Sequence, residues 1–227
     1  VFDASRKTFR TELYPQYKAN RAECPPDLVK QMPYFRELVR AMGLPLFEQL
    51  GYEADDIIGT LARRLASLDA DVTIVSGDKD LMQLVQGRIH VWDTMKDKHF
   101  YRDEVIEKFG VPPEKVVDIL ALTGDTSDNV PGLAGVGPKT AVELINRFGS
   151  FENIIESAEV IRNTSSIRNR AKIADLIDAD KEAIKLSRRL VEIVCDAPIL
   201  VAGDGERTLN DLSEDEILDV LLRVEPD

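Results

Sequence analysis

Cysteine is scarce in this sequence of 227 residues, which contains only Cys24 and Cys195. The two lie far apart and fit neither a metal-binding spacing nor a disulfide framework, so a reducing, cytoplasmic location is expected. No apolar run approaches the roughly 18 residues needed to span a bilayer. The opening residues 1–7 also lack the basic-then-apolar order of a signal peptide. We therefore expect no membrane partner.

Positive charge is also in short supply, with 29 Lys and Arg against 41 Asp and Glu and a net charge of −12. An acidic total argues weakly against a nucleic-acid partner, because phosphates attract Lys and Arg. The charge is nevertheless unevenly distributed. Segments 1–51 and 129–194 have net charges of +2 and +1, whereas 52–128 and 195–227 have −7 and −8. This segmentation, rather than the total, needs an explanation.

The length and the hydrophobic fraction of 44% are typical of one large globular domain or two intimate subdomains. Apolar spacing predicts a helix over 53–68, a β-branched strand over 72–75, a helix over 79–85 and a strand over 89–92. This alternation predicts an α/β fold with a parallel sheet.

The segments on either side of this α/β region are read from the same patterns. Residues 1–3 are typical of a strand end, 5–26 of a loop, 27–42 of a capped helix and 190–194 of a strand. Helical patterns dominate the second half, over 103–109, 113–123, 138–148, 151–158, 166–187 and 213–224. The second half is therefore expected to be a helical subdomain.

Carboxylates gather at the predicted element ends. They are Asp3, Glu53, Asp55, Asp56, Asp78, Asp80, Asp125 and Asp128. Singly, each can cap a helix or form a turn. Together they would share the crevice at the carboxyl ends of the strands, where ligands bind in α/β sheets.

A shared crevice of carboxylates favours bound cations. Two like charges about 4 Å apart repel by roughly 4 kcal/mol at an effective dielectric constant near 20. Oxygen ligands without nearby His or Cys suit Mg²⁺ or Mn²⁺. A pair of such ions is the usual arrangement for attack on a phosphodiester.

A glycine-rich turn at 131–141 opens a predicted helix. Gly135 and Gly137 permit close backbone approach, Pro138 suits the first helical turn, and Lys139 adds a positive charge. Free amides at such a helix start can hold a phosphate. The turn lacks the spacing of a nucleotide-binding P-loop, and an ordinary interhelical turn is the alternative.

The basic segment 6–21 interleaves cations with aromatic residues. Arg10, Lys18 and Arg21 alternate with rings such as Tyr17. Cations that meet phosphates and rings that stack on bases fit a nucleic-acid strand. A solvated loop anchored by its aromatic residues is the alternative.

Six short motifs occur in order over nearly the whole chain. They are Val1–Asp3 with Phe9-Arg10; Tyr17–Arg21; Gly51–Asp56; Ser76–Leu81 with Gln83-Leu84; Thr123–Asp125 with Ser127–Asn129; and Pro131-Gly132 with Gly135–Ala141. Each motif alone is weak, but the combination is highly specific. It resembles the 5′-nuclease domain of bacterial DNA polymerase I, in the flap endonuclease superfamily.

This resemblance implies a fold and a division of the chain. The fold is α/β, a PIN-like or resolvase-like parallel sheet flanked by helices, followed by a helical helix–hairpin–helix (H3TH) subdomain. Residues 1–128 would form the metal-binding nuclease core, with a mobile arch over 5–26. Residues 129–227 would form the DNA-binding subdomain, with its helix–hairpin–helix turn at 131–148.

The resemblance also implies roles for single residues. Around the first metal it places Asp3, Glu53, Asp55 and Asp56; around the second, Asp78, Asp80, Asp125 and Asp128. In the arch, Arg10, Lys18 and Arg21 would steer the scissile phosphate, and Tyr17 would stack on the substrate. Gly135, Gly137, Lys139 and Thr140 would grip the duplex backbone, where family carbonyls also hold K⁺.

The implied activity is that of a structure-specific 5′-3′ exonuclease and flap endonuclease in DNA replication and repair. Two Mg²⁺ ions, or Mn²⁺ in their place, would serve as cofactors. The partner would be DNA with 5′ flaps, nicks or 5′ ends, bound by a monomer in the cytoplasm at the nucleoid. Polymerase domains would follow in the parent chain.

Three further expectations follow from the sequence. The family carries an additional upstream strand that ends in another metal-binding Asp, and we expect a chain without it to fold poorly or cleave weakly. A catalytically silent module that binds flap or duplex DNA is an alternative function. A ribonuclease of the PIN class is a third, but the 131–148 turn and the long helical second half argue against it.

Overall fold

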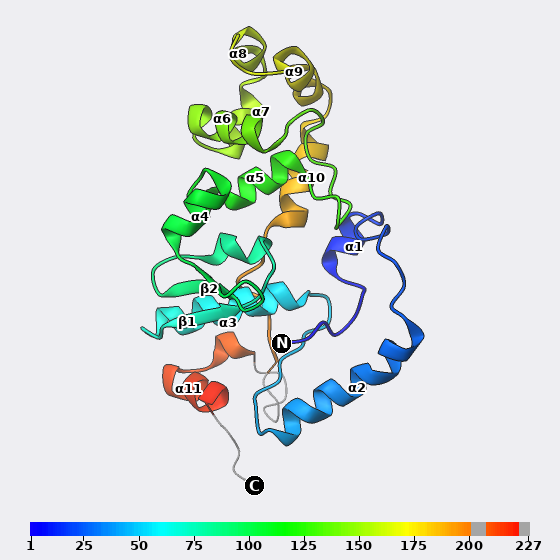
Figure 1. The fold of residues 1–227 in the computed structure, drawn as a ribbon, viewed down its shortest axis with the longest axis vertical. Helices are drawn as coiled ribbons and strands as arrows, with labels where there is room; N and C mark the ends of the chain where they lie inside the picture. The colour runs from blue at the N-terminus through cyan, green and yellow to red at the C-terminus, as the bar shows by residue number, and fades with distance from the viewer. Residues whose placement is uncertain (201–207, 223–227) are drawn as a thin grey trace.

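A three-stranded sheet lies in the lower half of the molecule, and helices rise from it in a column (Figure 1). The computed structural model describes residues 1–200 and 208–222. Strands β1 (Val72–Val75) and β2 (Ile89–Asp93) pair in parallel, as the alternating pattern predicted. Strand β3 (Lys98–Phe100) then pairs antiparallel with β2, so the sheet is mixed and its order is β1-β2-β3.

Helices account for most of the remaining described chain. The α-helices are α1 (Phe9–Leu13), α2 (Pro26–Ala41), α3 (Ala54–Ser67), α4 (Arg102–Phe109), α5 (Val116–Thr123), α6 (Pro138–Phe148), α7 (Phe151–Glu156), α8 (Ala158–Asn163), α9 (Arg170–Ala179), α10 (Lys181–Val191) and α11 (Glu214–Leu222). Short 3₁₀-helices are η1 (Asp80–Leu84), η2 (Pro113–Lys115) and η3 (Leu209–Asp211). None of the described helices is both long and apolar enough to cross a membrane.

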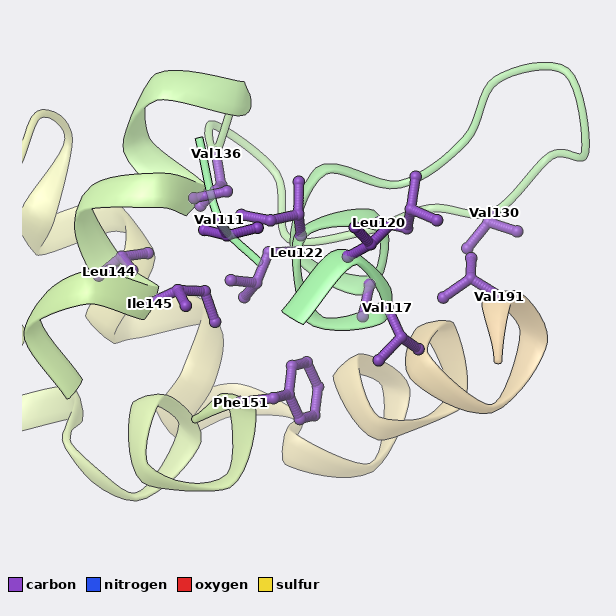
Figure 2. Packing of buried hydrophobic residues seen from close by; sticks show 14 of the residues in the cluster. Val111, Val117, Leu120, Leu122, Val130, Val136, Leu144, Ile145, Phe151 and Val191 are labelled. Carbon is purple, nitrogen blue, oxygen red and sulfur yellow. The ribbon is translucent and has the colours of Figure 1, made fainter. Parts of the chain in front are cut away.

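Helix α5 joins the sheet region to the helical region. Every residue from Val116 to Leu122 is buried, so this helix has apolar contacts on all sides. Figure 2 shows Val117, Leu120 and Leu122 among side chains of α6, α7 and α10. A single apolar cluster therefore extends from the strands to α10.

A second, smaller cluster forms on the other side of α3. Ile57 and Leu61 of α3 pack there against Ala197, Ile199 and Leu209 from the end of the chain. The described C-terminal part thus packs against α3, beside the sheet, and not against the helical column (Figure 1).

Several predicted elements are wrong. Residues 1–3 and 192–194 form no strand. In place of a strand ladder, the Ile193 amide donates to Gln83 Oε1 at 3.0 Å and the Val194 amide to Asp56 Oδ1 at 2.9 Å. The single helix predicted over 166–187 is interrupted at Asp180, whose side chain caps α10 through the Ala183 amide.

Four elements of the described chain were not predicted at all: α1 inside the expected loop 5–26, the strand β3, α8 and the 3₁₀-helix η3. Each is six residues or shorter, too short for periodicity to identify. By contrast, the helices predicted at 27–42, 53–68 and 138–148 occur as α2, α3 and α6.

Candidate metal centre and nucleic-acid interface

Acidic residues from three separate segments meet at one small cavity. Glu53 and Asp55 stand at the start of α3, Asp80 begins η1 just after β1, and Asp125 and Asp128 lie in the loop after α5. All five line a cavity of about 20 Å³. That volume holds one occupant the size of a water molecule. The structure thus brings together carboxylates that are up to 75 positions apart in sequence.

The loop with Asp125 and Asp128 is held in shape by two glycines. Gly124 and Gly132 have φ of +71° and +61°, in the left-handed region. The two approach so closely that a Cβ at Gly124 would lie 2.5 Å from the carbonyl oxygen of Val130. Only glycine permits both features. The backbone of Asp125 also exchanges two hydrogen bonds with Val130.

Asp3 and Asp78 lie exposed at the edge of this cluster. Asp3 Oδ1 accepts a hydrogen bond of 2.7 Å from the amide of Ala54 at the start of α3. Asp78 Oδ1 accepts one of 2.9 Å from the amide of Asp80. The negative charges of Asp3 and Asp78 also raise the pKa of Asp55, so both carboxylates belong to the same cluster of negative charge.

Burial and this cluster of negative charge raise the pKa of two carboxyl groups in the cavity. Burial, then the charge of Asp78, raises the pKa of Asp80 to about 7 and that of Asp55 to about 6. Burial also opposes ionisation of Asp125, but its hydrogen bonds with Lys79 and Ser127 outweigh this and lower its pKa to about 2. Uncompensated negative charge is thus concentrated at Asp55 and Asp80.

Four basic side chains compensate the other carboxylates, and one of them is Arg10, which lies 3.4 Å from Glu53 Oε2. Lys18 Nζ lies 2.7 Å from Glu53 Oε1 and 3.6 Å from Asp128 Oδ2. Arg21 lies 2.5 Å from Asp128, and Lys79 Nζ is 2.5 Å from Asp125 Oδ2. No three His, Cys, Asp or Glu side chains in the described ranges are gathered closely enough to hold an ion as they stand.

The donor set nevertheless fits a hard divalent cation. All its side-chain ligands are carboxylate oxygens, which Mg²⁺ and Mn²⁺ prefer. The Oδ1 atom of Asp80 is buried and has no hydrogen-bond partner. Such an atom is costly unless a ligand satisfies it. This oxygen of Asp80 is therefore of the kind that a bound cation would satisfy.

Arg10 lines the same cavity and lies 3.4 Å from Glu53 Oε2, but its main partner is Asp56. The Arg10 guanidinium forms two hydrogen bonds with Asp56, of 2.6 and 2.8 Å, and donates to the carbonyl oxygens of Leu190 and Glu192. Both side chains are almost fully buried. With its donors occupied, Arg10 is not free to meet a phosphate, and Asp56 is not free to bind an ion.

Asp56 also fixes backbone groups. Its carboxylate accepts hydrogen bonds from the amides of Glu53 and Val194. In this structure Asp56 and Arg10 are thus bonded to each other and to backbone groups, and their predicted metal and phosphate roles stay predictions. The pair joins α1, α3 and the segment after α10.

Tyr17 is also placed in the interior. It is 5% exposed and belongs to the main apolar cluster, so its ring is not available to stack on a base. Its hydroxyl lies 3.0 Å from Glu53 Oε2 and 3.2 Å from Asp128 Oδ2. In this structure Tyr17 therefore contacts two carboxylates of the cavity, and its predicted role of stacking on the substrate stays a prediction.

The predicted phosphate-binding turn is built as expected at the start of α6. Gly137 is the N-cap and Pro138 the first helical residue. Gly135 has φ of +91°, and space is open around Gly137. Lys139 is exposed and Thr140 half-buried.

A second turn beside it was missed from the sequence. Asn169, with φ of +58°, precedes α9 and donates from Nδ2 to the carbonyl oxygen of Gly135 at 3.4 Å. Arg168, Arg170 and Lys172 lie in the same stretch of sequence as Asn169. The side chain of Lys172 also approaches Gly135. The sequence feature that could have indicated this turn is the cluster of three cations within five residues.

Comparison with known proteins agrees with this geometry. Residues 1–110 match the 5′-3′ exonuclease N-terminal resolvase-like domain, and residues 111–211 match the 5′-3′ exonuclease C-terminal SAM fold. The chain belongs to the 5′-3′ exonuclease family. The resemblance to this family and the predicted fold class are thereby confirmed.

Curated members of the 5′-3′ exonuclease family are closely similar in sequence. DNA polymerase I of Rhizobium leguminosarum is 48% identical over 199 residues, which are 88% of this chain and 19% of that protein. A 5′-3′ exonuclease of Aquifex aeolicus is 42% identical over 88% of this chain and 65% of its own. The chain thus spans about a fifth of that polymerase's length.

Solved structures show the same fold. A bacteriophage T5 flap endonuclease, described as a pseudo-enzyme-product complex with DNA and metal ions, has a TM-score of 0.74 at 24% identity. The match covers 97% of this chain and 82% of that one. At this identity the likeness establishes the fold alone.

Proposed function

We propose that this chain hydrolyses DNA phosphodiester bonds as a structure-specific 5′-3′ exonuclease and flap endonuclease, with a role in replication and repair. The observation that carries the proposal is the convergence of Glu53, Asp55, Asp80, Asp125 and Asp128 on one cavity. The unsatisfied Oδ1 of Asp80 and its raised pKa support a cation there.

The proposed cofactor is a pair of Mg²⁺ ions, with Mn²⁺ as the alternative. Asp3, Glu53 and Asp55 would hold one ion, and Asp78, Asp80, Asp125 and Asp128 the other. When bound, such ions activate a water molecule and stabilise the leaving oxygen. A T5 5′-exonuclease is described with bound zinc ions, which supports a divalent metal in this fold. The K⁺ at the 131–148 turn stays a prediction.

The protein groups proposed to meet DNA lie on two surfaces. Lys18 and Arg21, at the cavity, would hold the scissile phosphate and orient it. The start of α6, with its free amides and Lys139, would hold the duplex backbone, helped by the adjacent turn at Asn169. Arg10, Asp56 and Tyr17 would act as positioning residues for the carboxylates.

Cleavage of a 5′-flap substrate with Mg²⁺ tests this function. In Asp80→Asn we expect cleavage to fall by about a hundredfold or more, because a lost metal ligand removes several kcal/mol of transition-state stabilisation. DNA binding should change only severalfold. Asp71→Asn is the matched control, since Asp71 is an exposed carboxylate that pairs with Arg88. Full turnover by Asp80→Asn would refute the role of this site.

A catalytically silent DNA-binding module is the second candidate. The observation in its favour is that Lys18, Arg21 and Lys79 already neutralise three of the carboxylates. Flap binding without Mg²⁺-dependent cleavage by this chain would support it. The same assay tests the expected impairment, by comparison with the full-length parent.

The broader setting is proposed on the relatives alone. Because those relatives are longer, we propose that polymerase domains follow in the parent chain. The monomeric state, the nucleoid location and the division into 1–128 and 129–227 stay predictions.

A further inference from the structure

The segment before α2 is docked directly on the acidic loop. The Lys18 amide donates to the Asp128 carbonyl oxygen at 2.9 Å, and Asn129 Nδ2 donates to the Gln16 carbonyl oxygen at 2.6 Å. These two bonds place the side chains of Lys18 and Arg21 within reach of Glu53 and Asp128. They do not depend on the charge of any carboxylate.

The two cationic side chains lie between two cavities. One is the small acidic cavity, whose Glu53 and Asp128 they contact. The other, of about 720 Å³, lies beneath the segment 5–26 and α2 and is lined by Lys18, Arg21 and also Arg6 and Arg36. Asp3 and Glu53 also line this larger cavity, and the charges of Lys18 and Arg21 are bonded to Glu53 and Asp128.

A divalent cation competes for the same carboxylates. Glu53 is bonded by both Tyr17 and Lys18, and Asp128 by Tyr17 and Arg21. Ligation of an ion takes up oxygen positions that now accept from Lys18 and Arg21. Its double charge also repels each nearby cation twice as strongly as a single charge would.

We infer that Lys18 and Arg21 are internal counter-ions of the metal site, and that a bound divalent ion releases them from Glu53 and Asp128, so that they meet a DNA phosphate from the larger cavity that they line. The inference rests on the proposed metal site. It implies an order: the protein gains two phosphate-binding charges only after the ion has bound. The backbone bonds of Lys18 and Gln16 keep the segment attached during this change.

Amine labelling followed by mass spectrometry tests the displacement directly. Mg²⁺ binding is measured in parallel by calorimetry on the same protein. The Lys18 side chain is 24% exposed, whereas that of Lys30, which pairs only with the exposed Asp27, is 76% exposed. We expect saturating Mg²⁺ to raise Lys18 labelling toward the Lys30 rate, about threefold by this exposure ratio, and to leave Lys30 unchanged.

Glu53→Gln is the matched variant, because glutamine keeps the size of the side chain but removes its charge. It should raise Lys18 labelling without any Mg²⁺, and added Mg²⁺ should then have less effect. Circular dichroism confirms that the variant is folded. If it does not fold, Asp128→Asn, which frees Arg21 and the second contact of Lys18, takes its place.

DNA affinity gives an independent readout. With Ca²⁺, which takes the same oxygen ligands, two added phosphate contacts should steepen the salt dependence of binding by about 1.4–1.8 in log–log slope. The double variant Lys18→Ala/Arg21→Ala should show no such increase.

The outcomes separate the two proposals. If calorimetry shows bound ions while Lys18 labelling and the salt slope stay constant, the displacement is overturned and the metal site stands. If no ion binds, the proposed metal site is itself overturned, and the displacement with it.

Discussion

At the residue scale, the buried pair of Arg10 and Asp56 shows how charge is used inside this protein. The two side chains are nearly inaccessible. Burial by itself would lower the pKa of Arg10, but the hydrogen bonds and charge of Asp56 outweigh it and raise this pKa. A buried pair adds little net stability, but loss of one partner leaves an uncompensated charge. The main effect of the pair is thus to orient α1, α3 and the segment after α10 relative to one another.

Arg10→Met should therefore destabilise the fold strongly. We expect a loss of about 3–5 kcal/mol in the free energy of unfolding, because Asp56 would be left buried and unpaired. Urea denaturation followed by circular dichroism measures it. Lys185→Met, which breaks an exposed pair with Glu182, should unfold at the wild-type urea concentration. Equal midpoints for Arg10→Met and wild type would contradict the assigned role.

At the element scale, the turn between α5 and α6 determines where two carboxylates stand. Its geometry depends on the close approach of Gly124 and Gly132. The loop between them carries Asp125 and Asp128 to the cavity. A change in this turn should therefore affect stability and the site together.

Gly124→Ala tests that dependence. A left-handed φ alone costs an alanine about 1–2 kcal/mol, and the contact with the Val130 carbonyl oxygen adds to it. Gly149→Ala is the control, because Gly149 has φ of +82° with nothing near its Cβ position. We expect Gly124→Ala to be the less stable variant in thermal denaturation and the only one with reduced flap cleavage. Similar behaviour of the two would argue against a special role of this turn.

At the scale of the whole molecule, one apolar cluster connects the sheet to the helical column. It contains Val91 of β2 and Phe100 of β3 together with Leu144 of α6 and Ile173 of α9. Helix α5 lies between these parts (Figure 1). The two halves are therefore expected to unfold together.

Two optical probes can test this cooperativity. The single tryptophan, Trp92 in β2, reports on the sheet, whereas far-ultraviolet circular dichroism reports mostly on helices. We expect the two urea transitions to coincide. Leu122→Ala, in the buried α5, should lower both midpoints equally, at a cost of about 2–5 kcal/mol. Separate transitions would show two independently folding units.

Local patterns in the sequence were sufficient for the long amphipathic elements. The helix over 138–148 could be predicted because Pro138 and Gly149 bound a periodic segment. The apolar run 190–194 could not be assigned in the same way, because short buried runs have no distinctive period. The conformation of this segment depends on hydrogen bonds with Gln83 and Asp56, which are distant in sequence.

The sequence by itself determined the family, the mainly helical second half and the identity of the acidic residues. It also separated acidic from basic segments, so that the net charge of −12 is no argument against DNA. Only the tertiary structure decided which charges face each other. Asp56, Arg10 and Tyr17 are buried, and each has hydrogen-bond partners inside the protein. Pairing across the cavity depends on distances between remote segments, and local sequence patterns carry no record of those distances.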